Sequence, residues 1–220
     1  MTYTHINNRL LSLFLFIFVS LLSVYQAQAM VLTYTFEGNV AVLDGQAPSP
    51  FNIGQTLSGS ISYDTSTPAS SMGPMNAAYN DAITLLNVAL GSYSLSGSGG
   101  TINIVNNNGL LGDNISLQVP VTGASLNGIH PVTFSAGLQD FTGLAIDGTN
   151  LGPLPAFSAF SPSTFFLTFA TEESGPAIPQ TLMVSGPITS VTPVPIPAAA
   201  VLFASGLMYL WQVIRPLTVH

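Results

Sequence analysis

Cysteine is absent from this 220-residue chain, and basic side chains are almost absent, because there is no lysine and there are only two arginines. The lack of cysteine excludes disulfides, cysteine-ligated zinc and thiol nucleophiles. Nine acidic residues against two basic ones give a formal net charge of -7. Such a chain has little with which to neutralise a phosphate backbone, so nucleic acid is not an expected partner.

The two arginines, Arg9 and Arg215, stand beside apolar runs at opposite ends of the sequence. Between them no ion pair with lysine or arginine can form. The fold must therefore rest on apolar burial and backbone hydrogen bonds. The length leaves room for one domain of ordinary size between the two ends.

The N-terminus has the order of a secretory signal. A polar start that contains Arg9 is followed by an apolar stretch over 10–24 and by Ala27-Gln28-Ala29. This predicts that residues 1–29 are a signal peptide, cleaved after Ala29. An uncleaved membrane anchor is the alternative, because the apolar stretch is only a little shorter than a span of about 20 residues.

The C-terminal segment 198–214 is apolar apart from Ser205 and Gln212. It predicts a transmembrane helix with Arg215 as its cytoplasmic anchor, and hence a membrane as partner. A buried core helix is the alternative. Prolines at 193, 195 and 197 predict an extended spacer over 187–197. The expected domains are thus an ectodomain over 30–186, the spacer, and a sorting or membrane segment with a short tail over 198–220.

The stretch "VPIPAAAVLFASGLMYL" resembles the PEP-CTERM sorting signal of Gram-negative bacteria that make extracellular polysaccharide. In that family a proline-containing motif precedes one apolar helix and a basic tail. The resemblance departs from the family at Ile196, where the family has glutamate, and in the tail, where Arg215 stands alone. It implies a recognition segment and a helix motif, formed respectively by Val194, Pro195, Ile196, Pro197, Ala198 and Ala199 and by Leu202, Phe203, Ser205, Gly206 and Leu207.

The resemblance also implies a partner and a destination. The family's signal is processed by exosortase, a membrane-embedded transpeptidase. An exported protein is therefore expected, either held in the inner membrane and facing the periplasm or released to the cell surface or extracellular matrix after processing. A plain uncleaved C-terminal anchor is the alternative.

Between Val31 and Val191 apolar residues recur at period two in short runs, which is typical of half-buried strands. In "LSGSISYD" the period places Leu57, Ile61 and Tyr63 on one face and the serines on the other. Asp-Gly and Asn-Gly pairs, such as Asn127-Gly128, suit the turns between strands. The expected fold is all-β, an antiparallel two-sheet β-sandwich or jelly roll, with a signal helix before it and a transmembrane helix after it.

One region, "YNDAITLLNVAL", is compatible with a short helix or with a strand that contains a bulge. Its apolar residues, among them Ile83 and Val88, fit both periods. We favour the strand.

Candidate chemistry is sparse. His130 is the one histidine between the two ends, so a nucleophilic triad would have to use it with Ser125 or Ser135 and with Asp113 or Asp140. Asp147 and Asn150 in "DGTN" place side-chain oxygens in one turn, which gives a weak hypothesis of a calcium site. Turn chemistry explains both sets, so we expect no catalytic residue, no metal and no cofactor.

The sequence favours a non-enzymatic, structural or adhesive domain in contact with extracellular polysaccharide. A carbohydrate-dependent or calcium-dependent binding module is the first alternative. A glycan-active enzyme is the second, and it requires two carboxylates roughly 5 to 9.5 Å apart across a groove.

Overall fold

A computed structural model describes residues 30–45, 47, 49–109, 112–171 and 180–195 of the chain. Nearly all regular structure in these ranges is β. The elements are β1 (Val31–Asn39), β2 (Val42–Gly45), β3 (Thr56–Asp64), β4 (Ser71–Met72), β5 (Asn76–Asn80), β6 (Ile83–Leu90), β7 (Tyr93–Gly97), β8 (Thr101–Asn108), β9 (Gly112–Gly123), β10 (Ile129–Asp140), the 3-10 turn η2 (Phe157–Ala159), β11 (Ser163–Thr171) and β12 (Thr181–Pro193).

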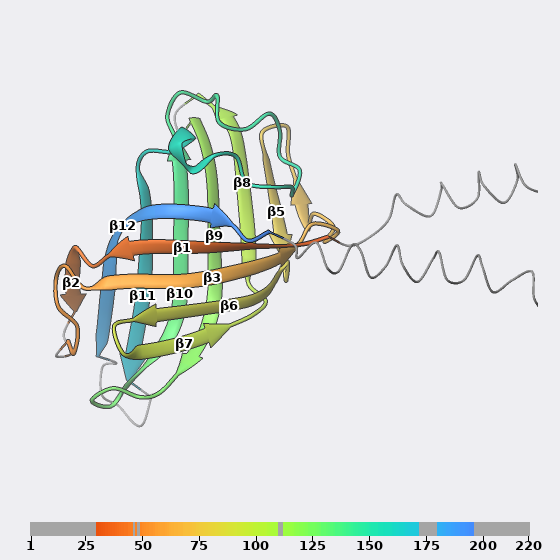
Figure 1. The fold of residues 1–220 in the computed structure, drawn as a ribbon. Helices are drawn as coiled ribbons and strands as arrows, with labels where there is room; N and C mark the ends of the chain where they lie inside the picture. Colours follow the sequence, from red (N-terminus) through yellow and green to blue (C-terminus); the bar gives the residue numbers. More distant parts are fainter. Residues whose placement is uncertain (1–29, 46, 48, 110–111, 172–179, 196–220) are drawn as a thin grey trace, which may run out of the picture.

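Eight of the strands form a closed antiparallel barrel in the order β10-β11-β12-β1-β3-β6-β7-β9, and β9 pairs with β10 to complete the ring. In Figure 1, β1, β3, β6 and β7 cross in front of β9, β10 and β11. Strands β8, β5 and β4 continue the sheet beyond β9, and β2 pairs with β12. The molecule is therefore one barrel with a flap of three additional strands.

The predicted two-sheet sandwich or jelly roll is wrong. The ring closes because two long strands each belong to both walls. β9 pairs with β10 and β8, and its last residues, Val121 to Gly123, pair with β7. β12 pairs with β11 up to Pro187 and with β1 from Ile188 onward. A period-two pattern is the same in a sandwich and in a barrel, so the sequence pattern did not distinguish them.

The path of β12 also moves the domain boundary expected at residue 186. Residues 187–193, expected as the start of a proline-rich spacer, form the half of β12 that pairs with β1. Pro193 is tolerated because it lies at the end of the strand. The barrel thus includes residues up to Pro193.

The predicted signal helix (1–29) and transmembrane helix (198–214) lie outside the described residues. Among the residues that are described, no helix is long and apolar enough to cross a membrane. The prediction of a membrane partner required such a helix, and within the described residues it is contradicted: the C-terminal part up to Pro195 consists of strand β12 and two residues of irregular chain.

Several local predictions are confirmed. In β3, Leu57, Ile61 and Tyr63 are buried and face the barrel interior. The region expected as helix or bulged strand is strand β6, with a bulge where Ser62 pairs with Leu85 and Tyr63 with Ile83. The Asn127-Gly128 turn has positive φ at both residues, 53° and 84°, as the hairpin between β9 and β10 requires.

The barrel interior is filled at one end by aromatic rings. Phe169 lies 5.4 Å from Phe51 and 5.9 Å from Tyr93 between ring centroids. Near the middle, Phe36 stacks on Phe134 at 5.6 Å. Such rings each bury a large apolar surface and stabilise the core beyond simple burial. The other end is not filled in the same way.

Candidate functional site

A cavity of about 550 Å³ occupies the end of the barrel beyond the Phe36–Phe134 pair. Its walls come from β1, β3, β8, β9, β10 and β12 and are mostly aliphatic, with Ile61, Ile102, Ile104, Ile115, Leu117, Leu138 and Ile188 among the lining residues. The loop that joins β10 to β11 covers the cavity through Ala145 to Gly148 and Asn150 to Pro155. The cavity is therefore an apolar chamber with a loop as its cover.

The start of this covering loop is fixed by two buried aspartates that pair across β9 and β10. Asp140 accepts hydrogen bonds from the backbone N–H groups of Thr142 (2.8 Å), Leu144 (2.9 Å) and Ala145 (3.0 Å). Asp113 accepts one from Ile146 N (3.0 Å) and one from Asn107 N (2.7 Å). Carboxylates that accept several N–H groups stabilise an irregular backbone locally.

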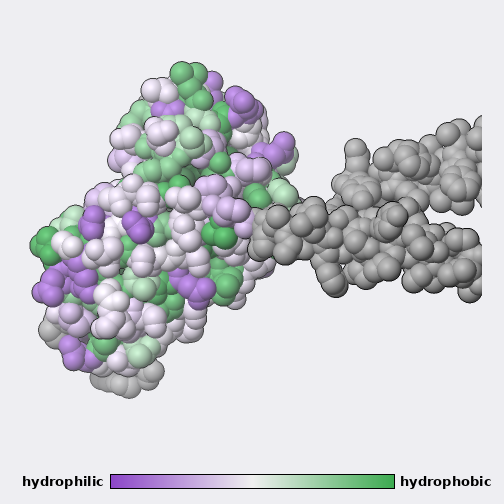
Figure 2. All heavy atoms as spheres, viewed as in Figure 1, coloured by the Kyte–Doolittle hydropathy of each residue, from purple (hydrophilic) through white to green (hydrophobic). Residues whose placement is uncertain are grey.

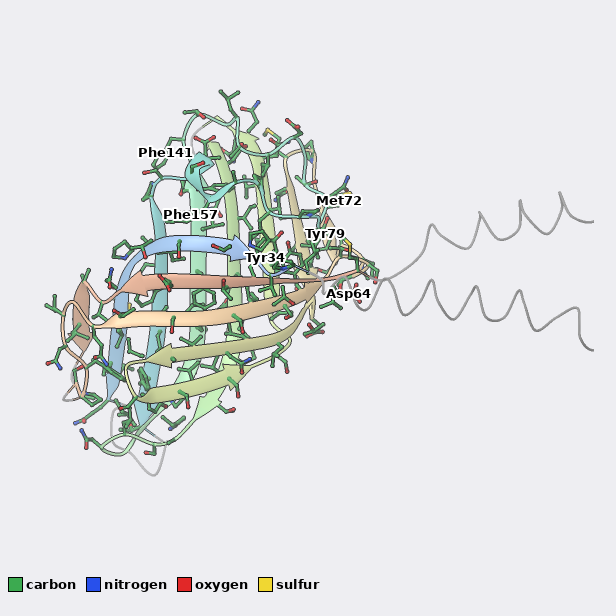
Figure 3. All side chains as sticks on the ribbon, viewed as in Figure 1. Tyr34, Asp64, Met72, Tyr79, Phe141 and Phe157 are labelled. Carbon is green, nitrogen blue, oxygen red and sulfur yellow. The ribbon has the colours of Figure 1, made fainter. Side chains whose placement is uncertain are left out.

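The end of the loop is held by tyrosine hydroxyl groups. Tyr63 Oη donates to the carbonyl oxygen of Gly152 (2.7 Å), and Tyr34 Oη accepts from Leu154 N (2.9 Å). Tyr79 Oη donates to Thr149 O (2.7 Å) and accepts from Leu151 N (3.1 Å). Figure 3 shows Tyr34 and Tyr79 close together at this end of the barrel. These three tyrosines, which we name the tyrosine clasp, fix the loop over the cavity.

Burial favours the neutral form of Tyr63 within the clasp. Burial raises the pKa of Tyr63 far above its ordinary value, and the neighbouring Tyr34, whose ring stacks on it at 6.0 Å, raises it further. An ionised phenol could not donate to Gly152 O, so the raised pKa keeps Tyr63 in the form that donates this hydrogen bond.

The Asp140 carboxylate should make the loop sensitive to acid. Hydrogen bonds from the Thr142 hydroxyl, and then from the backbone N–H groups of Leu144, Thr142 and Ala145, hold the pKa of Asp140 below its usual range. A group with a depressed pKa contributes stability above its unfolded value, about 3.9, and loses that contribution as the pH falls through the folded value. We expect Asp140→Asn to lower the urea midpoint of unfolding at pH 7. The difference in midpoint between the variant and the wild type should become smaller below about pH 4, where Asp140 itself becomes protonated.

Urea titrations of the two chains at pH 7, 5 and 3 measure this gap. Asp64→Asn is a useful comparison, because Asp64 also has a lowered pKa but binds only the neighbouring Ser66 on the surface. A gap between wild type and Asp140→Asn that stays constant from pH 7 to pH 3 would contradict the assignment.

The residues suggested for a triad are not assembled. His130 and Asp140 lie ten residues apart on β10, which is roughly 33 Å along an extended strand. Ser125 Oγ donates to the carbonyl oxygen of Ile129 (3.1 Å), and Ser135 lies mid-strand. Asp113 and Asp140, the two acids of that hypothesis, bind the backbone of the loop instead.

The weak calcium candidates, Asp147 and Asn150, lie on the loop with exposed side chains and line the cavity. Within the described ranges, no three His, Cys, Asp or Glu side chains come together as a metal site would need. The sequence pattern predicts one turn for these two residues; in the structure they lie in a bend of the loop, and the pattern does not indicate that this bend borders an apolar chamber.

A second feature is an ordered set of polar side chains on the outside of the barrel. Strand pairing aligns one outward residue from each of six neighbouring strands, in the order Thr192, Thr35, Ser60, Asn87, Ser96 and Thr122. We call this alignment the polar row. A second, parallel row contains Ser190, Glu37, Ser58, Ala89 and Ser94. The two rows line a depression of about 1060 Å³.

The polar row is open to solvent and chemically uniform. Within the described part of the chain, the side chains of Ser60, Asn87 and Ser96 form no hydrogen bond of their own, so their donors and acceptors face outward. In Figure 2 the surface over β1, β3, β6 and β7 is largely pale, as expected for serine and threonine, with few strongly hydrophobic or hydrophilic residues. Glu37 is the one charged residue in the two rows.

Two residues of the expected sorting signal are described. Val194 and Pro195 follow β12 directly and are exposed, and Val194 N donates to Thr33 O (2.8 Å). The remaining recognition residues, Ile196 to Ala199, the helix motif Leu202 to Leu207, Arg215, and the cleavage residues Ala27 and Ala29 lie outside the described residues.

The tyrosine clasp was missed by sequence reasoning, although a signal was present. Tyr34 and Tyr63 sit at inward positions of period-two runs, and a buried tyrosine hydroxyl usually has a hydrogen-bond partner. That rule predicts a polar contact for each of them but does not identify the loop that provides it.

Comparisons of the chain with protein-family models, with curated proteins and with solved structures found no match.

Proposed function

We propose that this chain is an exported, non-enzymatic barrel protein whose polar row adheres to a neutral extracellular polysaccharide. The observation that carries the proposal is the alignment of six small polar side chains across six strands. Serine and threonine hydroxyls and the asparagine amide each donate and accept hydrogen bonds, as sugar hydroxyls do.

The spacing of the polar row supports a polymeric ligand. Neighbouring strands lie about 4.8 Å apart, which is close to the length of one pyranose ring in an extended chain. A polysaccharide lying across the strands would meet a new polar side chain at each step. Many weak, regularly repeated contacts of this kind produce adhesion through multivalency rather than through one deep site.

The charge of the chain favours a neutral polymer. No lysine or arginine occurs between residues 10 and 214, so an anionic polysaccharide would find no cation on the barrel. Glu37 beside the polar row would repel it further. Uncharged glucans meet neither obstacle.

Export is supported by the agreement between the signal sequence and the fold. The expected cleavage after Ala29 leaves Met30 as the first residue, and β1 begins at Val31. Met30 already belongs to the fold, since its carbonyl oxygen accepts from Thr65 N (3.2 Å). The resemblance to a PEP-CTERM signal supports release of the protein to the matrix after processing.

The adhesive role is tested by affinity electrophoresis through gels that contain a neutral glucan. We expect the wild-type chain to be retarded, and the double variant Thr35→Glu/Asn87→Glu to bind about tenfold more weakly, because two charges in the polar row must be desolvated against sugar. Both positions are exposed, so the fold should tolerate the change.

A matched control carries the same charges elsewhere. Gln118→Glu/Thr181→Glu adds two glutamates at exposed positions outside the polar row and should be retarded like the wild type. Intact mass of the exported chain, expected to start at Met30, is measured on the same samples. The adhesive role would be refuted if both double variants were retarded equally, or if no neutral polysaccharide retarded the wild-type chain. An N-terminus that still carries residues 1–29 would refute export.

A further inference from the structure

We propose that the cavity under the β10–β11 loop binds one neutral lipophilic molecule, with a hydrocarbon body in the cavity and an uncharged polar head at Asp147 and Asn150. This site is independent of the polar row, because residues of the row alternate along the strands with residues that line the cavity, as Ser60 does with Ile61, and so face away from it. A volume of about 550 Å³ falls within the range of small-molecule pockets, about 300–1,000 Å³. Eight-stranded barrels have an interior of the right width for one such ligand.

The lining requires an apolar body. Side chains from six strands meet there, and those of Ile102, Ile104, Ile115 and Ile188 are hydrocarbon. Protein interiors are otherwise packed as tightly as organic crystals, and the opposite end of this barrel follows that rule with its three aromatic rings. A ligand would complete the packing that the side chains leave incomplete at this end.

The cover is preformed. Asp113 and Asp140 fix the start of the loop, and the tyrosine clasp fixes its end. Their side-chain oxygens are bound to backbone groups of the loop and, at Asp113, also to the backbone N–H of Asn107 in β8, so they are not free to bind a ligand head. A preformed site avoids the entropic cost of ordering a loop when the ligand enters.

The exposed polar groups on the lining determine the head group. Asp147 and Asn150 are exposed side chains that border the cavity. An alcohol can donate to the Asp147 carboxylate and accept from the Asn150 amide. A carboxylate head would instead face Asp147 with no lysine or arginine between residues 10 and 214 to compensate it. The site is therefore assigned to a neutral amphiphile of the long-chain alcohol type rather than to a fatty-acid anion.

The test uses the full chain with isoleucine methyl groups labelled for NMR, and two probes of equal length, 1-dodecanol and dodecanoate. We expect dodecanol to shift the methyl signals of the cavity residues Ile61, Ile102 and Ile115, with saturation at one molecule per chain. The signals of Ile53, which is exposed, and of Ile83, which is buried but does not line the cavity, should stay unchanged. Dodecanoate should bind about tenfold more weakly at pH 7.

A variant that fills the cavity provides the control. Ala136 lines the cavity, and Ala136→Leu should weaken dodecanol binding about tenfold, because added methylene groups occupy the space of the ligand. Ala78→Leu makes the same change at a half-buried alanine of β5 that does not line the cavity and should leave binding unchanged.

The outcomes separate clearly. Binding that leaves the cavity methyl signals unmoved, or that persists equally in a folded Ala136→Leu chain, would locate the probe on another apolar part of the chain and overturn the proposal. Equal affinity for dodecanoate would overturn the assignment to a neutral head. If Ala136→Leu fails to fold, the methyl shifts of the wild type still decide between these outcomes.

Discussion

Replacing Gly186 by alanine should lower the free energy of unfolding by about 3 kcal/mol. At Gly186 strand β12 passes close to the end of β1 and the residues that follow it, where an added β-carbon would overlap the carbonyl oxygen of Asn39 and lie 2.9 Å from Ala41 N. Both contacts are backbone atoms, which cannot move aside as a flexible side chain could. Since β12 changes partners next to this glycine, from β11 to β1, the substitution strains the closure of the barrel itself.

Gly137→Ala is the matched control. Gly137 lies within β10, and an added β-carbon there would meet no atom within 4 Å. Its effect should stay within about 0.5 kcal/mol, or be slightly stabilising through the unfolded state. Urea unfolding followed by near-ultraviolet circular dichroism measures both. Similar midpoints for the two variants would show that the close approach at Gly186 does not limit the fold.

Phe169→Ala should cost about 4 kcal/mol. Phe169 is completely buried and contacts both Phe51 and Tyr93 through ring faces and edges. Removing its ring leaves a void at the filled end of the barrel, where rigid strands prevent collapse around it. The loss combines the transfer of a large apolar surface to water with the cost of the void.

Phe166 on the same strand provides the comparison. Its side chain points outward and is 41% exposed, so Phe166→Ala should cost less than about 1 kcal/mol. The difference between the two variants in urea unfolding measures the contribution of the aromatic cluster. Equal costs would mean that the cluster contributes no more than a surface phenylalanine.

Local features of the fold could be predicted from the sequence because they depend on local chemistry. Alternation placed Leu57 and Ile61 inside, and the Asn127-Gly128 turn followed from the tolerance of these residues for positive φ. Closure could not be predicted, because it depends on pairings between distant residues, such as Tyr34 with Pro193. No periodicity within either strand encodes that choice.

The candidate site was less predictable than the fold. From the sequence, Asp113 and Asp140 are possible catalytic acids, because the sequence does not show which groups a carboxylate will bind. Only the register of β9 and β10 shows that the two carboxylates pair and serve one loop. The polar row is similar: the alternation in β3 predicted that Ser60 faces outward, but the alignment of six strands is a property of the assembled barrel.

The pairing of β1 with β12 has a mechanical consequence. These strands are antiparallel neighbours, and the beginning of one lies beside the end of the other, with Val194 N bonded to Thr33 O. Both ends of the described chain therefore leave the barrel at the same point, as Figure 1 shows. A force that pulls these ends apart acts on one hydrogen bond at a time, like the opening of a zipper. A force along the strands would instead load the whole ladder together, so the barrel resists tension unequally in different directions.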